Sequence, residues 1–194
     1  MLLTRNDGAP VRSRDSDGTA ASDGVAAETP SFRFTKATRK LVPTYRGRIE
    51  RRQREASERA AVAARDILDD LYTEGFLDPA NWSEGRYANA FDGFAGGARR
   101  RAEARPDLLT AGSEAGDHFE QIRPLAGRIE TRVLLGRGGG PTLLLSFVRF
   151  SADAMGPEPV TLRSTGQFFF ERVRGSWKIV SFHVTRTDTP REPA

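Results

Sequence analysis

Few side chains in the apolar segments of this sequence can carry acid–base chemistry, and its two histidines are His118 and His183. His183 lies between Phe182 and Val184, where an imidazole could titrate near neutral pH. Together with Glu171 it could form a dyad that acts as a general base. The competing interpretation, which the residue types favour, places His183 at a sheet margin or facing solvent.

Several other chemistries are excluded by composition. The absence of cysteine excludes disulfides, Cys-ligated zinc, iron–sulfur clusters and cysteine nucleophiles. Two histidines cannot build a His-rich metal centre, and no HExxH, EF-hand or Walker motif is present. The glycine run at 136–140 is followed by the strand-like segment 142–145, so it predicts a hairpin tip and not a phosphate loop. We expect neither a metal nor a cofactor.

The net charge of +4 on 194 residues is unevenly distributed. Residues 1–30 and 55–194 each sum to −2, whereas residues 31–54 hold nine basic side chains and one acid. The segment 31–56 is therefore interpreted as a basic, partly helical arm. Its basic residues are Arg33, Lys36, Arg39, Lys40, Arg46, Arg48, Arg51, Arg52 and Arg54. Such an arm could bind an anionic membrane surface or an acidic partner, with nucleic acid less favoured, or could simply aid solubility.

The arrangement of elements predicts an α+β fold. Apolar side chains at steps of three and four indicate a first helix from about residue 44, with a core-facing part over 57–76, and a second helix over 87–98. Ser113 is expected to cap a short third helix. Pro124 should end the third helix. Four strands are expected at 126–135, 142–153, 160–173 and 176–187, and their short connections predict an antiparallel meander with helices on one face. The folded domain is thus expected at 57–187, with disordered tails at 1–30 and 188–194.

The last two predicted strands, with the turn Arg172-Val173-Arg174-Gly175-Ser176-Trp177-Lys178-Ile179, resemble the closing hairpin of the NTF2-like (SnoaL-like, cystatin-related) superfamily. The segments Phe94-Ala95-Gly96-Gly97-Ala98 and Leu108-Leu109-Thr110-Ala111-Gly112 are similar to those of small actinobacterial Mce-associated proteins. The resemblance implies a cone in which N-terminal helices pack on a curved antiparallel sheet. In place of the membrane-anchoring helix usual in those proteins, this chain has the charged segment 46–59.

Strand alternation places Phe168 and Phe170 on one face and Phe169 on the other, with Phe147 or Phe182 beside it. Because an exposed apolar face needs cover, we expect a homodimer through the sheet. Our first hypothesis is a non-catalytic binding or scaffold module for a protein partner or an apolar small molecule. The candidate ligand-binding residues are Phe147, Arg149, Gln167 and Phe169.

The alternative hypothesis is a cofactor-independent isomerase, dehydratase or cyclase of the SnoaL or ketosteroid isomerase type, which the resemblance makes available. In that case His183 or Glu171 would be the base. Both hypotheses place the protein in the cytoplasm, with peripheral attachment to a membrane as an option.

Overall fold

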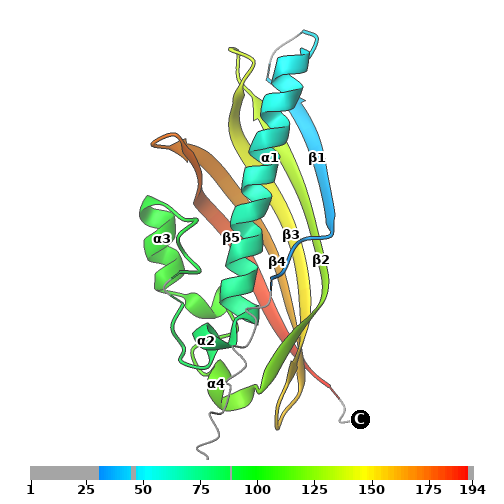
Figure 1. The fold of residues 1–194 in the computed structure, drawn as a ribbon. Coiled ribbons are helices and arrows are strands. Elements are labelled where there is room, and N and C mark those ends of the chain that lie inside the picture. Colours follow the sequence, from blue (N-terminus) through cyan, green and yellow to red (C-terminus); the bar gives the residue numbers. More distant parts are fainter. Residues whose placement is uncertain (1–30, 45–46, 88, 192–194) are drawn as a thin grey trace, which may run out of the picture.

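The structure, a computed structural model, describes residues 31–44, 47–87 and 89–191. It is an α+β fold in which a five-stranded mixed sheet has the strand order β1-β2-β3-β4-β5 (Figure 1). The strands are β1 (Lys36–Pro43), β2 (Gln121–Leu135), β3 (Pro141–Met155), β4 (Val160–Val173) and β5 (Ser176–Pro190). The helices are α1 (Arg51–Tyr72), α2 (Pro79–Trp82), α3 (Gly96–Glu103) and α4 (Ala115–His118), with a π-helical turn at Thr73–Leu77 and a 3-10 turn at Pro106–Leu108.

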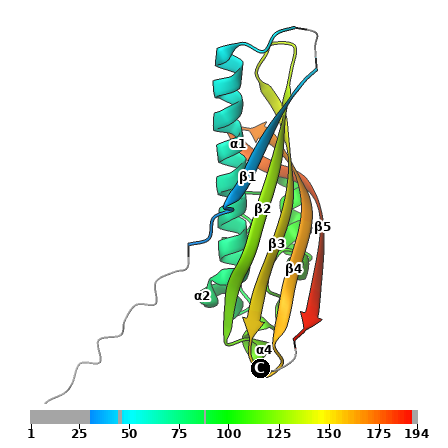
Figure 2. The same cartoon turned by 90° about the vertical axis from the view of Figure 1, so that its right-hand side faces the viewer.

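The long helix α1 lies along one face of the sheet, and the long strands curve beside it (Figures 1 and 2). We name this the inner face and the opposite one the outer face. Along α1 the small and apolar side chains Ser57, Ala60, Ala64 and Leu68 are buried at steps of three and four. Burial extends to Phe76 in the π-helical turn, which confirms the core-facing segment predicted at 57–76.

The start of α1 differs from the sequence-based expectation of a helix from residue 44. The helix begins at Arg51 and is preceded by Glu50, whose backbone N–H donates to Oε1 of Gln53 at 2.8 Å. Residues 36–43, expected in a basic and partly helical arm, instead form β1, which pairs in parallel with β2. Phe34, just before β1, is buried and packs edge-on against Tyr72 of α1. The segment 31–56 therefore contributes both a strand and core side chains.

The other strands agree with the predicted antiparallel meander, because β2, β3, β4 and β5 pair antiparallel in sequence order. β4 has the predicted bounds, whereas β2, β3 and β5 are longer. β5 continues to Pro190, three residues into the expected C-terminal tail. The expected disordered tail at 1–30 lies outside the described residues.

Two predicted helices are shorter than expected. Phe91 and Phe94 are buried but not helical, because Phe91 lies in a turn and Phe94 forms an isolated β-bridge with Ile179. α3 begins only at Gly96, which has φ of +52°. Glycines at 93, 96 and 97 weaken helix formation there. The third helix is reduced to α4, and Ile122 and Pro124, expected within and after it, belong to β2. Pro124 is accommodated because it borders a β-bulge in the pairing with β3.

Aromatic side chains fill the space between the helices and the inner face. At one end Phe34, Tyr72, Phe76 and Phe150 make ring contacts with centroids 4.8–5.4 Å apart. Towards the other end Phe94 packs edge-on against Phe182, with ring centroids 5.5 Å apart. Within the described parts of the chain, no helix is long and apolar enough to cross a bilayer.

Candidate functional site

The two residues of the hypothetical dyad, His183 and Glu171, are exposed on the outer face of the sheet. His183 on β5 is opposite Gln167 on β4, whereas Glu171 on β4 is opposite Lys178. Four residues of β4 separate the two positions, which is roughly 13 Å at the usual rise of a strand. The fold therefore does not assemble these two side chains into a hydrogen-bonded dyad.

The candidate ligand-binding residues lie together on the outer face, on the neighbouring strands β3 and β4. Phe147 is directly opposite Gln167, and Phe169 and Arg149 are the next outward-facing positions on the two strands. The guanidinium of Arg132 lies over the Phe147 ring at 4.6 Å from its centroid. These residues form an open surface and not the lining of a cone.

Phe182, the third aromatic side chain considered for the outer face, lies instead on the inner face and is 8% exposed. A β-bulge causes this placement. Phe169 is opposite Ser181 while Phe170 is opposite Ile179, so Val180 is an extra residue in β5. The extra residue shifts the alternation of the strand by one and turns Phe182 inward.

Half-buried apolar side chains from four strands adjoin one another on the outer face. Leu134 is opposite Val42 on one side and Leu143 on the other, and Leu145 is opposite Phe169. We call this surface the apolar patch. It consists of Val42, Leu134, Leu143, Leu145, Phe147 and Phe169.

The basic residues predicted to form one arm are dispersed by the fold. Lys36 and Lys40 are on the outer face of β1, whereas Arg39 projects to the other side, where its guanidinium is 3.6 Å from the Glu58 carboxylate. Arg51 at the start of α1 pairs with Glu55 at 2.7 Å. The other described basic residues of the predicted arm are exposed, and they are Arg33, Arg48, Arg52 and Arg54. Arg46 lies outside the described residues. Their charges therefore do not act as a single unit.

Buried polar groups on the inner side connect segments that are distant in sequence. Asp69 of α1 accepts a hydrogen bond from the backbone N–H of Phe34 at 2.9 Å, and its carboxylate is 3.6 Å from Nε of Arg65. Burial raises the pKa of Asp69 more than these two contacts lower it. The hydroxyls of Tyr72 and Ser164 are 2.9 Å apart, and burial raises the pKa of Tyr72. These groups join α1 to β4 and to the segment that precedes β1.

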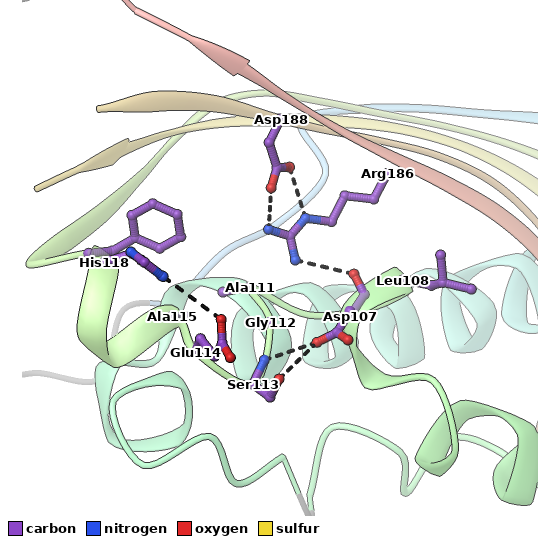
Figure 3. A pocket seen from close by; sticks show the side chains of 11 residues that line it. Asp107, Leu108, Ala111, Gly112, Ser113, Glu114, Ala115, His118, Arg186 and Asp188 are labelled. Carbon is purple, nitrogen blue, oxygen red and sulfur yellow. Dashed lines mark hydrogen bonds and ion pairs between the residues drawn. The ribbon is translucent and has the colours of Figure 1, made fainter. Parts of the chain in front are cut away.

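A cavity of about 560 Å³ lies between β5 and the segment 107–119 (Figure 3). The Arg186 guanidinium is central to it and binds both carboxylate oxygens of Asp188, at 2.9 and 2.6 Å. The same guanidinium donates to the backbone carbonyls of Asp107 and Thr110. The Asp107 carboxylate accepts from the backbone N–H of Ser113 at 3.0 Å. The polar groups of this cavity are thus largely occupied in joining β5 to the loop.

His118 is exposed at the rim of this cavity, with Nε2 3.9 Å from the Glu114 carboxylate (Figure 3). A single imidazole beside one carboxylate offers too few ligands for a typical zinc site. Among residues 31–44, 47–87 and 89–191, no group of three or more His, Asp or Glu side chains is placed to hold a metal ion.

Two residues of the outer face were not among the sequence-predicted candidates. Arg128 and Arg163 lie near Arg149 and line the same groove of about 500 Å³. Strand alternation could have placed Arg149 and Arg163 on one face, because residue 149 is an outward position of β3 and residue 163 is an outward position of β4. Their proximity to Lys36 could not be inferred without β1.

The chain was also compared with known proteins. No protein-family model, curated protein or solved structure matches it.

Proposed function

We propose that this chain is a non-catalytic, NTF2-like binding module that forms a homodimer through the apolar patch. The observation that carries the proposal is the patch itself, in which six half-buried apolar side chains from four strands adjoin. None of the helices that the structure describes covers this face of the sheet (Figure 2). Burying such a surface against a second copy is favourable by about 25 cal/mol for each Å² removed from water.

The likeness to NTF2-like proteins rests on the order of the elements. A long helix, short helices and four long antiparallel strands follow one another along the chain, and the closing hairpin carries the motif that suggested the resemblance. The inner face is filled by aromatic side chains such as Tyr72, Phe150 and Phe168. A filled inner face favours a role in binding through the outer surface over one in converting a ligand held inside the cone.

Charges at the borders of the patch favour a second copy as the partner. Lys40 borders it on β1, and Glu171 borders it on β4, opposite Lys178. A twofold axis that lies between the two stacked outer faces, roughly along the strands, brings Lys40 of one copy towards Glu171 of the other. A self-complementary surface of this kind is what a twofold homodimer requires.

Molar mass from light scattering tests this proposal. The wild-type chain should elute with twice its chain mass of 21.4 kDa, whereas Phe169→Glu should elute as a monomer because a carboxylate then lies within the apolar patch. Thr187→Glu is the matched control, since residue 187 is exposed on β5 outside the patch. It should remain dimeric.

Charge reversal provides a second, independent test of the twofold arrangement. Lys40→Glu and Glu171→Lys should each weaken the dimer, and the double variant should recover it because the pair is restored in reversed polarity. A monomeric wild-type chain at micromolar concentration would refute the dimer. A dimer that is insensitive to Phe169→Glu would show that another surface mediates it.

A further inference from the structure

Four basic side chains from four strands line the groove on the outer face that was described above. Lys36 comes from β1, Arg128 from β2, Arg149 from β3 and Arg163 from β4. We call this the basic groove. It lies beyond the apolar patch, towards the end of the sheet where β2 begins, and its volume is about 500 Å³.

The strand register aligns three of these charges in one row. Arg128 is directly opposite Lys36 on one side and Arg149 on the other, and Arg163 is opposite Ser151, the next outward position on β3. Like charges directly opposite each other in an antiparallel pair have β-carbons about 4.5–5.5 Å apart and destabilise the sheet. An anion seated in the groove would remove this repulsion.

The nearest acids on this face do not neutralise the row, because they are engaged with other cations. Glu130 pairs with Arg132 at 3.1 Å. Asp153 pairs with Arg191 at 2.5 Å and accepts from the Thr161 hydroxyl at 3.1 Å. Within the part of the chain that the structure describes, none of the four cations of the basic groove makes an ion pair.

The rest of the lining indicates which anion fits. The hydroxyl-bearing residues Ser151 and Thr165 line the groove beside the arginines, and arginine forks together with hydroxyls suit phosphate oxygens. Leu125, at the bulge of β2, lines the same groove and is 57% exposed. An exposed leucine beside a row of cations offers contact to an apolar substituent of the anion.

We propose that the basic groove binds a phosphate monoester that carries an apolar chain, with the phosphate held by Lys36, Arg128, Arg149 and Arg163 and the apolar chain against Leu125. A soluble alkyl phosphate and the headgroup of a lipid such as phosphatidic acid share this chemistry. A single nucleic-acid strand fits less well because base stacking needs free aromatic faces. The nearest outward aromatic ring, Phe147, is covered by Arg132. This inference does not depend on the dimer.

Titration calorimetry of the full chain tests the proposal with four probes. They are inorganic phosphate, decyl phosphate below its micellar concentration, phosphatidylcholine vesicles with or without phosphatidic acid, and single-stranded DNA. Decyl phosphate should bind more tightly than inorganic phosphate. Arg128→Gln/Arg149→Gln should weaken the binding roughly tenfold or more, because two charge-assisted contacts are lost. Leu125→Ser should weaken decyl phosphate binding and leave inorganic phosphate binding unchanged.

The matched control is Arg105→Gln/Arg137→Gln, which removes the same charge at two exposed sites away from the groove. It should bind like the wild type. Binding to vesicles only in the presence of phosphatidic acid would identify a lipid headgroup as the source, whereas binding to decyl phosphate alone would identify a soluble ester. The proposal is overturned if no probe binds, if the control pair loses as much affinity as the groove pair, or if single-stranded DNA binds more tightly with the same dependence on Arg128 and Arg149.

Discussion

The hydroxyl pair of Tyr72 and Ser164 provides a sharp test of how α1 is fixed to the sheet. The two oxygens are 2.9 Å apart, and each residue is only 1% exposed. Among the described residues, neither hydroxyl has another hydrogen-bond partner. Tyr72→Phe should therefore cost about 1–2 kcal/mol, since it removes one buried hydrogen bond and strands the serine hydroxyl. Its ring contacts with Phe34, Phe76 and Phe150 would remain.

Ser164→Ala should cost about 1–3 kcal/mol, because it leaves the buried tyrosine hydroxyl unsatisfied. The double variant removes both polar groups and should cost clearly less than the sum of the single changes, with a coupling of about 1 kcal/mol. Urea unfolding of the wild type, the two single variants and the double variant measures these free energies. In thermal unfolding, each kcal/mol lost should lower the Tm by roughly 2–4 °C for a chain of this size. Additive costs would refute the reasoning, since they would mean that the two hydroxyls do not satisfy each other.

Three further changes test other features of the fold. Burial raises the pKa of Asp69 above its ordinary value of 3.8, so the charged carboxylate destabilises the folded state. As the pH rises from 3.5 to 7, the wild type should therefore lose stability relative to Asp69→Asn. Urea unfolding at both pH values measures the difference, and a relative gain by the wild type would contradict it. Gly116→Ala should cost about 1–3 kcal/mol in thermal unfolding because its β-carbon would collide with the Ser83 carbonyl oxygen, and an unchanged Tm would show that the two backbones can separate. Glu58→Ala should change the unfolding free energy by less than about 0.5 kcal/mol because its pair with Arg39 is exposed, and a loss above 1 kcal/mol would contradict this.

The sheet could be predicted from the sequence wherever a strand follows strict alternation. Phe168 and Phe170 are buried on the inner face and Phe169 lies on the outer face, as the period of two requires. The same alternation gives the wrong face for Phe182 because Val180 is an extra residue at a bulge. A bulge is fixed by the pairing of two strands, so its position is not evident from either strand alone.

β1 was not evident from the sequence for a related reason. Most of its side chains are exposed, as is usual for a short edge strand rich in lysine and arginine, and its partner β2 lies about ninety residues further along the chain. Local propensity cannot detect a pairing of this kind. The consequence for the site is direct, because Lys36 joins Arg128 and Arg149 only through that pairing.

The structure brings one set of candidate residues together and separates the other. Phe147, Gln167 and Phe169 lie together because β3 and β4 form a hairpin whose register follows from a short turn. His183 and Glu171 are separated because they occupy different rows of the β4–β5 pair. Residue type alone suggested the dyad, and residue type carries no information about register.

The most direct test of the proposed dimer is a distance measured between two copies in solution. The chain has no cysteine, so a single spin label can be attached at Thr185→Cys on the outer face or at Arg100→Cys on α3, both exposed positions. If the copies pair through the apolar patch, pulsed electron spin resonance should give a shorter distance between the labels at 185 than between those at 100. Absence of any dipolar signal at 185, or a shorter distance between the labels on α3, would contradict pairing through the outer face.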